Sequence, residues 1–344
     1  MIAFIHTDEN AVYYECGYSN DNCIYLALGS ASYLLTDSRY TLDATTALKK
    51  SSPNTKVVID FDLSKRVAKL ISKVKIRKIA FDPKEWDYYR ITQIQEYTRL
   101  RWVAKPDLSQ KKRLIKTQAE IEILAKAVKQ GARAFRDFAM MIDEEGVGKT
   151  EKELHFLAEN FMRRFGKNAL SFDPIVAIGA HAAKPHAHPT DRVLEEGDLL
   201  LFDAGLKHKR YCSDRTRTVR VREGFVFNKK QKFDSKKLQR AYDAVLKAHD
   251  KQIEKAQSGM RASQIDKIGR EIIDKAGFGK YFIHSTGHGV GLDIHELPII
   301  SGRSKTKIED GMVYTIEPGI YIPDSFGIRI EDMVVMREGS AEVL

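Results

Sequence analysis

The stretch "LLLFDAG" at Leu199–Gly205 and the stretch "YCSDRTRT" at Tyr211–Thr218 decide the fold of the second half of this chain. Asp203 ends a run of four apolar residues and is followed by a Gly-containing turn. Asp214 comes eleven residues later, at the start of a segment rich in β-branched residues that is typical of a strand. The residues between can make the reversal. We therefore expect an antiparallel pair that brings both aspartates to one place.

A second pair of segments repeats this arrangement. "MVYTIEPGIYI" reads as a strand with a break at Pro318-Gly319, "PDSFG" as a turn, and "GIRIEDMVVM" as the returning strand. Glu317 lies in the first of these strands and Glu331 in the second, and a Gly-flanked histidine, His288 in "STGHGVG", precedes both. Two hairpins thus each offer two carboxylates, and one imidazole joins them.

These five side chains have the chemistry of a metal centre. An unpaired charge beside apolar segments is costly, so each acid needs a partner. Four carboxylates balance two divalent cations, and carboxylates with one imidazole suit Mn, Zn, Co or Fe. Two metals about 3.5–4 Å apart can hold and activate a hydroxide. A single acid of this kind is most often a strand-end charge or a salt-bridge partner, but five in this order and setting favour a dinuclear site.

The ordered set Asp203, Asp214, His288, Glu317 and Glu331 resembles the ligands of the pita-bread metallopeptidases, which include methionine aminopeptidase, aminopeptidase P and prolidase. The motifs "FDAG", "GHGVGLDIHE", "TIEPGIY" and "GIRIED" carry the resemblance. "YLLTDSRYTLDA" at Tyr33–Ala44 is similar to the creatinase-type domain that precedes the catalytic domain in aminopeptidase P and prolidase. The resemblance therefore implies that branch.

The expected architecture has two domains: a creatinase-like N-terminal α/β domain at 1–110, followed by an α+β pita-bread catalytic domain at 111–344 with a curved antiparallel sheet. In the first, strands alternate with helices expected from Asp37 or Ser38, at 64–72 and at 84–97, which is typical of an α/β layer. In the second, helices are expected after the capping boxes Thr117–Glu120 and Thr150–Glu153, and at 237–257 and 263–276.

The resemblance also implies a role for each ligand. Asp203 would hold one metal, His288 and Glu317 mainly the other, and Asp214 and Glu331 would bridge both. Two divalent ions, with Mn²⁺ favoured and Zn²⁺, Co²⁺ or Fe²⁺ possible, would then activate water for attack on a peptide carbonyl.

Side chains around the ligands complete the expected site. Glu317 would also accept a proton as general base. His186, in a "PH" step, and His295 would donate hydrogen bonds to the substrate carbonyl. His284 would frame the substrate pocket, and Arg329 would orient an acid or a substrate group. Thr216 and Thr218 share a strand face with Asp214 and could hydrogen-bond the ligands.

Two features leave alternatives open. His181, His186 and His188 lie within eight residues and could form a separate metal site; His181 is also a departure from the family, whose members usually have a smaller polar residue there. Lys209, Arg210 and Arg215 are unusual charges for the first ligand hairpin.

Composition describes a soluble globular protein, with 344 residues, 43% of them hydrophobic and 30% charged. No run approaches the roughly 18 apolar residues of a membrane span, and the first residues do not resemble a signal peptide. Three cysteines without metal-type spacing are expected to be free thiols in a reducing cytoplasm. The net charge of +10 is spread out, and its one dense cluster, at 228–237, reads as a solvated loop. We expect neither a nucleic-acid nor a membrane partner.

The function that the resemblance implies is removal of the N-terminal residue from peptides with proline in the second position, by a dinuclear Xaa-Pro aminopeptidase that forms a homodimer. A prolidase restricted to Xaa-Pro dipeptides would use the same ligands and is the alternative. A non-catalytic pita-bread binding module is disfavoured, because such relatives typically lose metal ligands and all five are present here.

Overall fold

The computed structural model describes residues 3–74 and 76–344, so three residues of the expected first domain, Met1, Ile2 and Lys75, lie outside the described part. The chain divides into two compact units, Met1–Arg113 and Leu114–Leu344. In the described residues, no helix combines the length and the apolar character needed to cross a bilayer.

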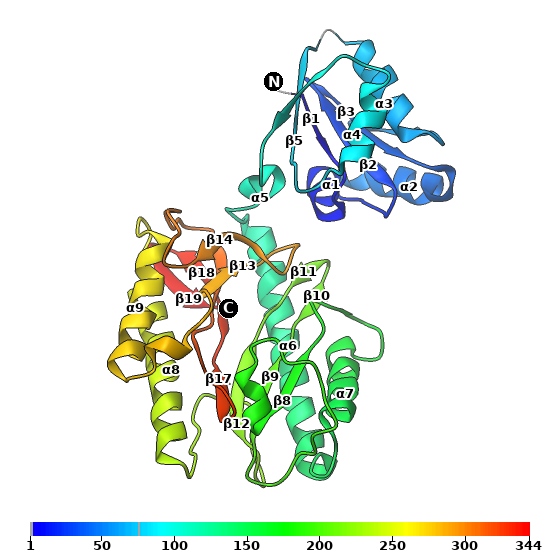
Figure 1. The fold of residues 1–344 in the computed structure, drawn as a ribbon. Coiled ribbons are helices and arrows are strands. Elements are labelled where there is room, and N and C mark those ends of the chain that lie inside the picture. Colours follow the sequence, from blue (N-terminus) through cyan, green and yellow to red (C-terminus); the bar gives the residue numbers. More distant parts are fainter. Residues whose placement is uncertain (1–2, 75) are drawn as a thin grey trace. The chain divides into compact units, whose positions relative to one another are not determined.

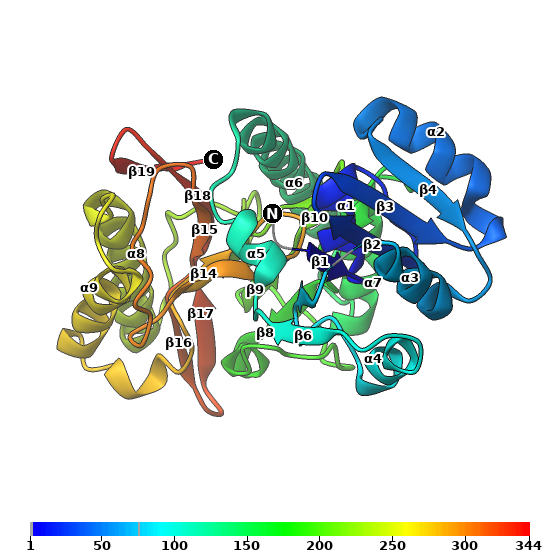
Figure 2. The same cartoon turned by 90° about the horizontal axis from the view of Figure 1, so that it is seen from above.

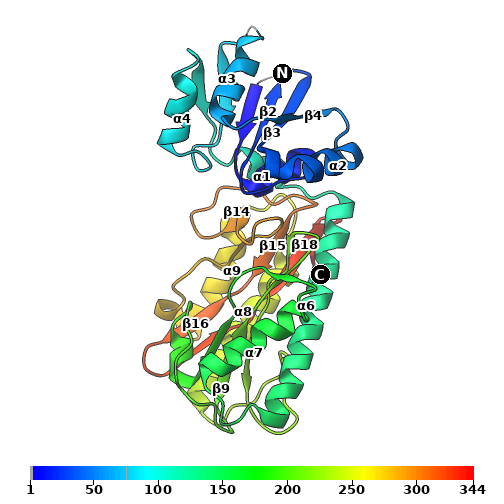
Figure 3. The same ribbon diagram turned by 90° about the vertical axis from the view of Figure 1, so that its right-hand side faces the viewer.

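The first unit is a three-layer α/β domain around a six-stranded mixed sheet with the order β4-β3-β2-β1-β5-β6. Alternate residues of β2 point to opposite faces. Ile24 and Leu26 pack with the helices α3 and α4, whereas Cys23 and Tyr25 pack with α1 and α2 (Figure 3). The strands are β1 (Ala3–His6), β2 (Cys23–Leu28), β3 (Ala31–Thr36), β4 (Thr55–Ile59), β5 (Lys78–Phe81) and β6 (Arg101–Ala104). The helices are α1 (Glu9–Cys16), α2 (Thr41–Ser51), α3 (Leu63–Ser72), α4 (Tyr88–Gln95) and α5 (Leu108–Lys112).

Two of the expected helices in this unit begin later than their sequence signals indicate. The segment after Asp37 first makes a short 3₁₀ turn, Ser38–Tyr40, before α2 begins, because the Asp37 side chain caps that turn by accepting from the Arg39 N–H. The helix expected at 84–97 is only α4, since Asp87 is its N-cap and accepts from the Arg90 N–H.

The second unit has four long helices around antiparallel strands. Both predicted capping boxes are present, at the starts of α6 (Gln118–Glu145) and α7 (Glu151–Arg163). The other two, α8 (Lys236–Lys255) and α9 (Ala262–Lys275), start one residue before the expected positions. The strands are β7 (Ala169–Leu170), β8 (Ile175–Ile178), β9 (Leu199–Asp203), β10 (Leu206–His208), β11 (Tyr211–Cys212), β12 (Thr216–Arg220), β13 (Gly287–Gly289), β14 (Glu296–Ile300), β15 (Val313–Ile316), β16 (Gly319–Ile322), β17 (Phe326–Arg329), β18 (Asp332–Arg337) and β19 (Ser340–Val343), with short 3₁₀ helices at Gly179–Ala183 and Gly279–Tyr281.

Both ligand hairpins form as predicted. Strand β9 pairs antiparallel with β12, with Thr216 opposite Asp203. The chain between them turns at Lys209 and Arg210, which both have positive φ angles, of 49° and 73°. In the second hairpin, β15 pairs with β18 and β16 with β17, all antiparallel.

The strands lie between two helix pairs (Figures 1 and 2). Helices α6 and α7 pack against β8, β9 and β12 through an apolar cluster that contains Phe135, Phe138 and Phe202. Helices α8 and α9 pack against β16 and β17 through a second cluster that includes Tyr242 and Ile328. Two helices followed by a ligand hairpin, taken twice, make the pita-bread architecture that the resemblance implied.

Candidate metal centre and active site

All nine residues proposed for the site line one cavity of about 570 Å³ in the second unit. They are Asp203, Asp214, His186, His284, His288, His295, Glu317, Arg329 and Glu331. The residues come from both hairpins, from the β13 segment and from the loop after β8. The fold therefore gathers side chains that the sequence separates by well over a hundred positions.

Each acid sits at a point where one strand ends and the next begins. Asp203 is the last residue of β9, Asp214 lies between β11 and β12, Glu317 follows β15, and Glu331 precedes β18. Asp203 is still paired with Thr216, whereas Asp214, Glu317 and Glu331 lie outside the strands. The Glu331 N–H donates to the Thr216 carbonyl at 3.1 Å and joins the two hairpins.

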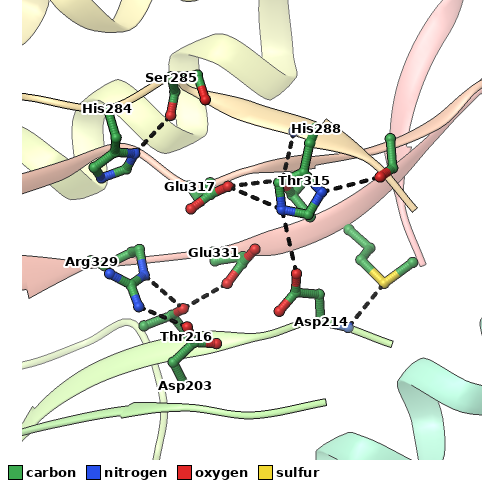
Figure 4. A network of polar contacts seen from close by, with 12 residues as sticks. Asp203, Asp214, Thr216, His284, Ser285, His288, Thr315, Glu317, Arg329 and Glu331 are labelled. Atoms are coloured by element: carbon green, nitrogen blue, oxygen red, sulfur yellow. Dashed lines mark hydrogen bonds and ion pairs between the residues drawn. The ribbon is translucent and has the colours of Figure 1, made fainter. Parts of the chain in front are cut away.

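Three donors form the centre of the cluster. The ligand atoms of Asp214, His288 and Glu331 lie within 4.8 Å of one another. His288 Nε2 lies 3.6 Å from Asp214 Oδ2 and 3.4 Å from Glu317 Oε1 (Figure 4). Because His288 Nδ1 lies 3.1 Å from the Gly289 carbonyl, that nitrogen carries the proton and Nε2 presents its lone pair to the carboxylates. This is the tautomer that a metal-binding histidine needs.

Asp203 is held at one side of this cluster. Its Oδ2 accepts from Arg329 at 2.7 Å, whereas its buried Oδ1 has no hydrogen-bond partner among the described residues. A buried carboxylate oxygen without a donor leaves room for a further partner, and a bound cation is one that fits. Together with the three central donors and Glu317, it makes a set of hard oxygens and one imidazole, which fits divalent cations.

The pKa values of the cluster are shifted in the direction that disfavours charge on its members. Burial raises the pKa of Glu317 to about 8. Burial, and then the neighbouring Glu331, hold the pKa of Asp214 well above its usual range, and burial and Glu317 do the same to Glu331. Burial and then His295 lower the pKa of His288 to about 4, so the imidazole is neutral near pH 7. Arg329, paired with Asp203, is therefore the one cation that these side chains supply to the four carboxylates.

The guanidinium of Arg329 donates hydrogen bonds to four other residues. Its Nε donates to Thr216 Oγ1 at 3.0 Å, and a terminal nitrogen donates to the Tyr321 hydroxyl at 2.7 Å and to the Pro185 carbonyl at 3.2 Å, in addition to the Asp203 contact. Thr216 Oγ1 in turn donates to Glu331 Oε2 at 2.6 Å. Thr216 thus hydrogen-bonds a predicted ligand, and Arg329 supports two of them.

The histidines differ in how far they are engaged. Both nitrogens of His284 are occupied, since Nδ1 lies 2.7 Å from the Ser285 carbonyl and Nε2 lies 2.9 Å from the Tyr321 hydroxyl. Burial lowers the pKa of His284 to about 3, so Nδ1–H donates and Nε2 accepts. The His295 ring meets the His288 ring edge to face at 4.4 Å, and burial lowers its pKa.

Two residues of the site had not been singled out from the sequence. Tyr321 connects Arg329 to His284, and the alternation of inward residues along "GIYI" is the signal that could have found it. Glu151 is fully buried at the start of α7 and binds the loop that carries His186. Its carboxylate accepts from the Ile178 N–H, the Thr190 N–H and hydroxyl, and His181 Nδ1.

This contact bears on the separate metal site considered for His181, His186 and His188. His181 is engaged by Glu151, at 2.8 Å, while His186 and His188 line the main cavity. Among the described residues, the group whose ligand atoms lie close enough together to share a metal ion is instead Asp214, His288 and Glu331.

The chain is similar to known proteins over most of its length. The model of "Metallopeptidase family M24" matches residues 122–338. An Xaa-Pro dipeptidase of Pyrococcus furiosus is 42% identical over 255 residues, which are 74% of this chain and 68% of that protein. The structure of an Xaa-Pro dipeptidase from Bacillus anthracis superposes with a TM-score of 0.89 at 33% identity, over 99% of this chain and 92% of that one. An X-Pro aminopeptidase from Thermotoga maritima gives 0.86 at 31% identity, over 100% and 95%.

Proposed function

Because this chain belongs to metallopeptidase family M24, we propose that it is a dinuclear metallo-exopeptidase that releases the N-terminal residue from peptides with proline in the second position. The observation that carries the proposal is the single cavity into which four carboxylates and the Nε2 lone pair of His288 converge. The buried Oδ1 of Asp203, which has no hydrogen-bond donor among the described residues, supports the assignment of this acid as a metal ligand.

The residues divide between holding metal and handling substrate. Asp203, Asp214, His288, Glu317 and Glu331 would hold two divalent ions, with Mn²⁺ as the expected pair. When bound, such ions lower the pKa of water and polarise the substrate carbonyl. Arg329 and Thr216 keep Asp203 and Glu331 in place. We therefore propose that Arg329 orients acidic ligands and does not contact the substrate.

Proton transfer and carbonyl binding fall to the other cavity residues. Glu317 would accept the proton of the attacking water, and a general base works best with a pKa near the operating pH. His186 and His295 line the cavity and would donate hydrogen bonds to the carbonyl oxygen as its negative charge develops. His284, with both nitrogens engaged, would shape the wall of the pocket.

The charges of the cavity favour peptides longer than two residues. In a dipeptide, the carboxylate lies one residue after the scissile bond and needs a positive partner when it is desolvated. Among the lysines and arginines of residues 3–74 and 76–344, Arg329 alone lines the cavity. Its guanidinium already donates hydrogen bonds to Thr216, Tyr321 and Asp203. This supports an aminopeptidase. The similarity to Xaa-Pro dipeptidases favours the second candidate, a dipeptidase.

A substrate pair separates the two candidates. Protein stripped with a chelator and reloaded with Mn²⁺ is given an Xaa-Pro dipeptide and an Xaa-Pro-Yaa-Yaa tetrapeptide. Release of Xaa from the tetrapeptide is the expected result, and cleavage of the dipeptide alone would make the chain a dipeptidase. Asp214→Ala and Glu331→Ala should abolish either activity while leaving the protein folded. Full activity in either variant would contradict the dinuclear site.

A further inference from the structure

The segment that joins β7 to β8 contains a bulge beside the first proposed metal ligand. Leu170 of β7 pairs with Leu206, whereas Ile175 of β8 pairs with Asp203. Between these two pairs, four residues of the β7–β8 segment face only two residues of the β9–β10 segment. Bulges of this kind re-aim a side chain and are common next to active sites. The bulge therefore brings extra side chains to the edge of the main cavity.

Contacts on one side hold the bulge in place and leave Asp173 free. The Ser171 N–H donates to the Gly205 carbonyl at 3.0 Å, and the Ser171 hydroxyl donates to the Ser213 carbonyl at 2.9 Å. The Phe172 ring packs so closely on Gly205 that a Cβ there would lie 3.0 Å from it. Asp173 lines the main cavity, and its carboxylate makes no hydrogen bond or ion pair with the rest of the described chain.

Asp173 lies at the mouth of the cavity, whereas the proposed metal ligands lie at its floor. Asp173 is exposed, while Asp203, Asp214 and Glu331 are at most 7% exposed. Asp173 is two residues from Ile175, the strand partner of Asp203, so its Cα lies roughly 8 Å from that of Asp203 at ordinary strand spacings. A group bound at the metals stays short of Asp173, but the end of a long side chain attached to it can reach the carboxylate.

The carboxylate of Asp173 has no positive partner in the cavity. Among the acids of residues 3–74 and 76–344 that line this space, Asp173 alone stands outside the proposed ligand set, whose four charges two divalent ions would balance. Arg329 equals Asp173 in number of charges, but it is buried, pairs with Asp203 at 2.7 Å and donates its other hydrogen bonds elsewhere. An exposed carboxylate at the mouth therefore attracts a positive group of the substrate.

We propose that Asp173 makes the protein prefer peptides whose first residue is lysine or arginine, by pairing with the charged end of that side chain. The scissile carbonyl belongs to the first residue, so this residue is held at the metals, and its α-amino group stays at the floor of the cavity with it. Proline in the second position carries no charge, and later residues lie beyond it on the leaving side. The inference rests on the proposed peptidase function and names its substrate class.

Peptide kinetics of the Mn²⁺-loaded protein test this preference at pH 8 and low ionic strength. One pair of tetrapeptides, Lys-Pro-Ala-Ala and Met-Pro-Ala-Ala, compares a charged with an uncharged first side chain of similar length. A second pair, Ala-Pro-Lys-Ala and Ala-Pro-Met-Ala, moves the comparison past the proline. We expect the first-position ratio of kcat/KM, lysine over methionine, to be about two- to fivefold higher in the wild type than in Asp173→Asn, the factor typical of one exposed ion pair.

Further variants keep the result specific. Asp173→Glu retains the charge and should retain the ratio, and high salt should reduce the ratio in the wild type. Glu196→Gln is the matched control, because Glu196 is exposed in the loop between β8 and β9 and does not line the cavity, so the ratio should not change.

Three outcomes would overturn the inference. An unchanged ratio in Asp173→Asn would show that the carboxylate does not select the first residue. Equal losses of kcat/KM for lysine and methionine would assign it to the α-amino group, and a change confined to the second pair would assign it to the leaving peptide. Absence of cleavage of every peptide by the metal-replete wild type would contradict the proposed function together with this inference, whereas the other outcomes leave the proposed function intact.

Discussion

The carboxyl group of Glu317 is buried next to Asp203, Arg329 and His288, and burial raises its pKa from the usual 4.5 to about 8. Without metal, the folded protein therefore holds a proton at Glu317 between these pH values, while the unfolded chain has released it. Folding stability falls with rising pH wherever the folded state binds more protons. Glu317 therefore lowers the free energy of unfolding of the metal-free protein most at and above pH 8, and does not lower it below pH 4.5.

We predict that metal-free Glu317→Gln is more stable than the metal-free wild type at pH 8, by up to about 5 kcal/mol. This figure converts the rise in the pKa of Glu317, from 4.5 to about 8, at roughly 1.4 kcal/mol per pKa unit. The two proteins should converge near pH 5. Urea unfolding of chelator-treated protein across this range measures the difference. With Mn²⁺ present the order should reverse, because the variant loses a ligand. A constant difference between pH 5 and 8 would argue against a proton held at this carboxyl group.

Tyr321 makes a second prediction at the residue scale. Its hydroxyl accepts from Arg329 and donates to His284 Nε2, and burial raises its pKa to about 12, so it stays protonated. Tyr321→Phe leaves a buried acceptor and a guanidinium N–H unpaired, which costs about 1–3 kcal/mol for each group. We expect a loss of stability of that order and a reduced kcat with two metals still bound. Metal analysis and peptide kinetics check this, and wild-type kcat in the variant would show that the contact is dispensable.

At the scale of the elements, the sequence predicts what local patterns determine. The hairpins follow from apolar runs with turn residues between them, and the starts of α6 and α7 from their capping boxes. Contacts between distant elements leave no such pattern. Arg329 and Asp203 are 126 residues apart, and only the packing of the two hairpins shows that the arginine serves an acid. For the same reason the five proposed ligands, Arg329 and Thr216 could be named from motifs and strand alternation, but the support from Tyr321 and Glu151 could not.

Glu151 illustrates how an element positions the site. It binds Ile178, the last residue of β8, and Thr190, in the loop between β8 and β9. These residues are 27 and 39 positions away in sequence, and His186 lies between them. We predict that Glu151→Gln lowers kcat/KM by about 10–100-fold while the protein still binds two Mn²⁺ ions, because substrate contacts move and the ligand hairpins do not.

The capping residue Glu153 on the same helix provides a matched control. It is exposed and accepts from Thr150 without touching the loop. Glu153→Gln should therefore have little effect on stability and keep its kcat/KM. Equal losses of activity in the two variants would mean that helix stability, and not the loop anchor, controls the site.

At the scale of the whole molecule, the proposed metal centre lies between two halves of the second unit. Asp203 and Asp214 come from the hairpin that packs on α6 and α7. His288, Glu317 and Glu331 come from the strands associated with α8 and α9. Polar contacts between the halves include the Arg329–Asp203 pair, the Thr216–Glu331 bond and the Arg217–Asp332 pair. Two bound cations would be held by ligands from both halves and would therefore link them.

Removal of metal should therefore loosen the junction between the halves and leave the first unit unaffected. We predict faster amide hydrogen exchange in β9, β12, β15 and β18 after chelation, because opening there no longer breaks metal bonds. Protection in β1 to β6, which contain no proposed ligand, should stay the same. Exchange followed by mass spectrometry, with and without Mn²⁺, measures both. If protection fell equally in the two units, metal would stabilise the chain as one cooperative body; if it fell in neither, the carboxylates would already be satisfied by Arg329, Thr216 and bound protons.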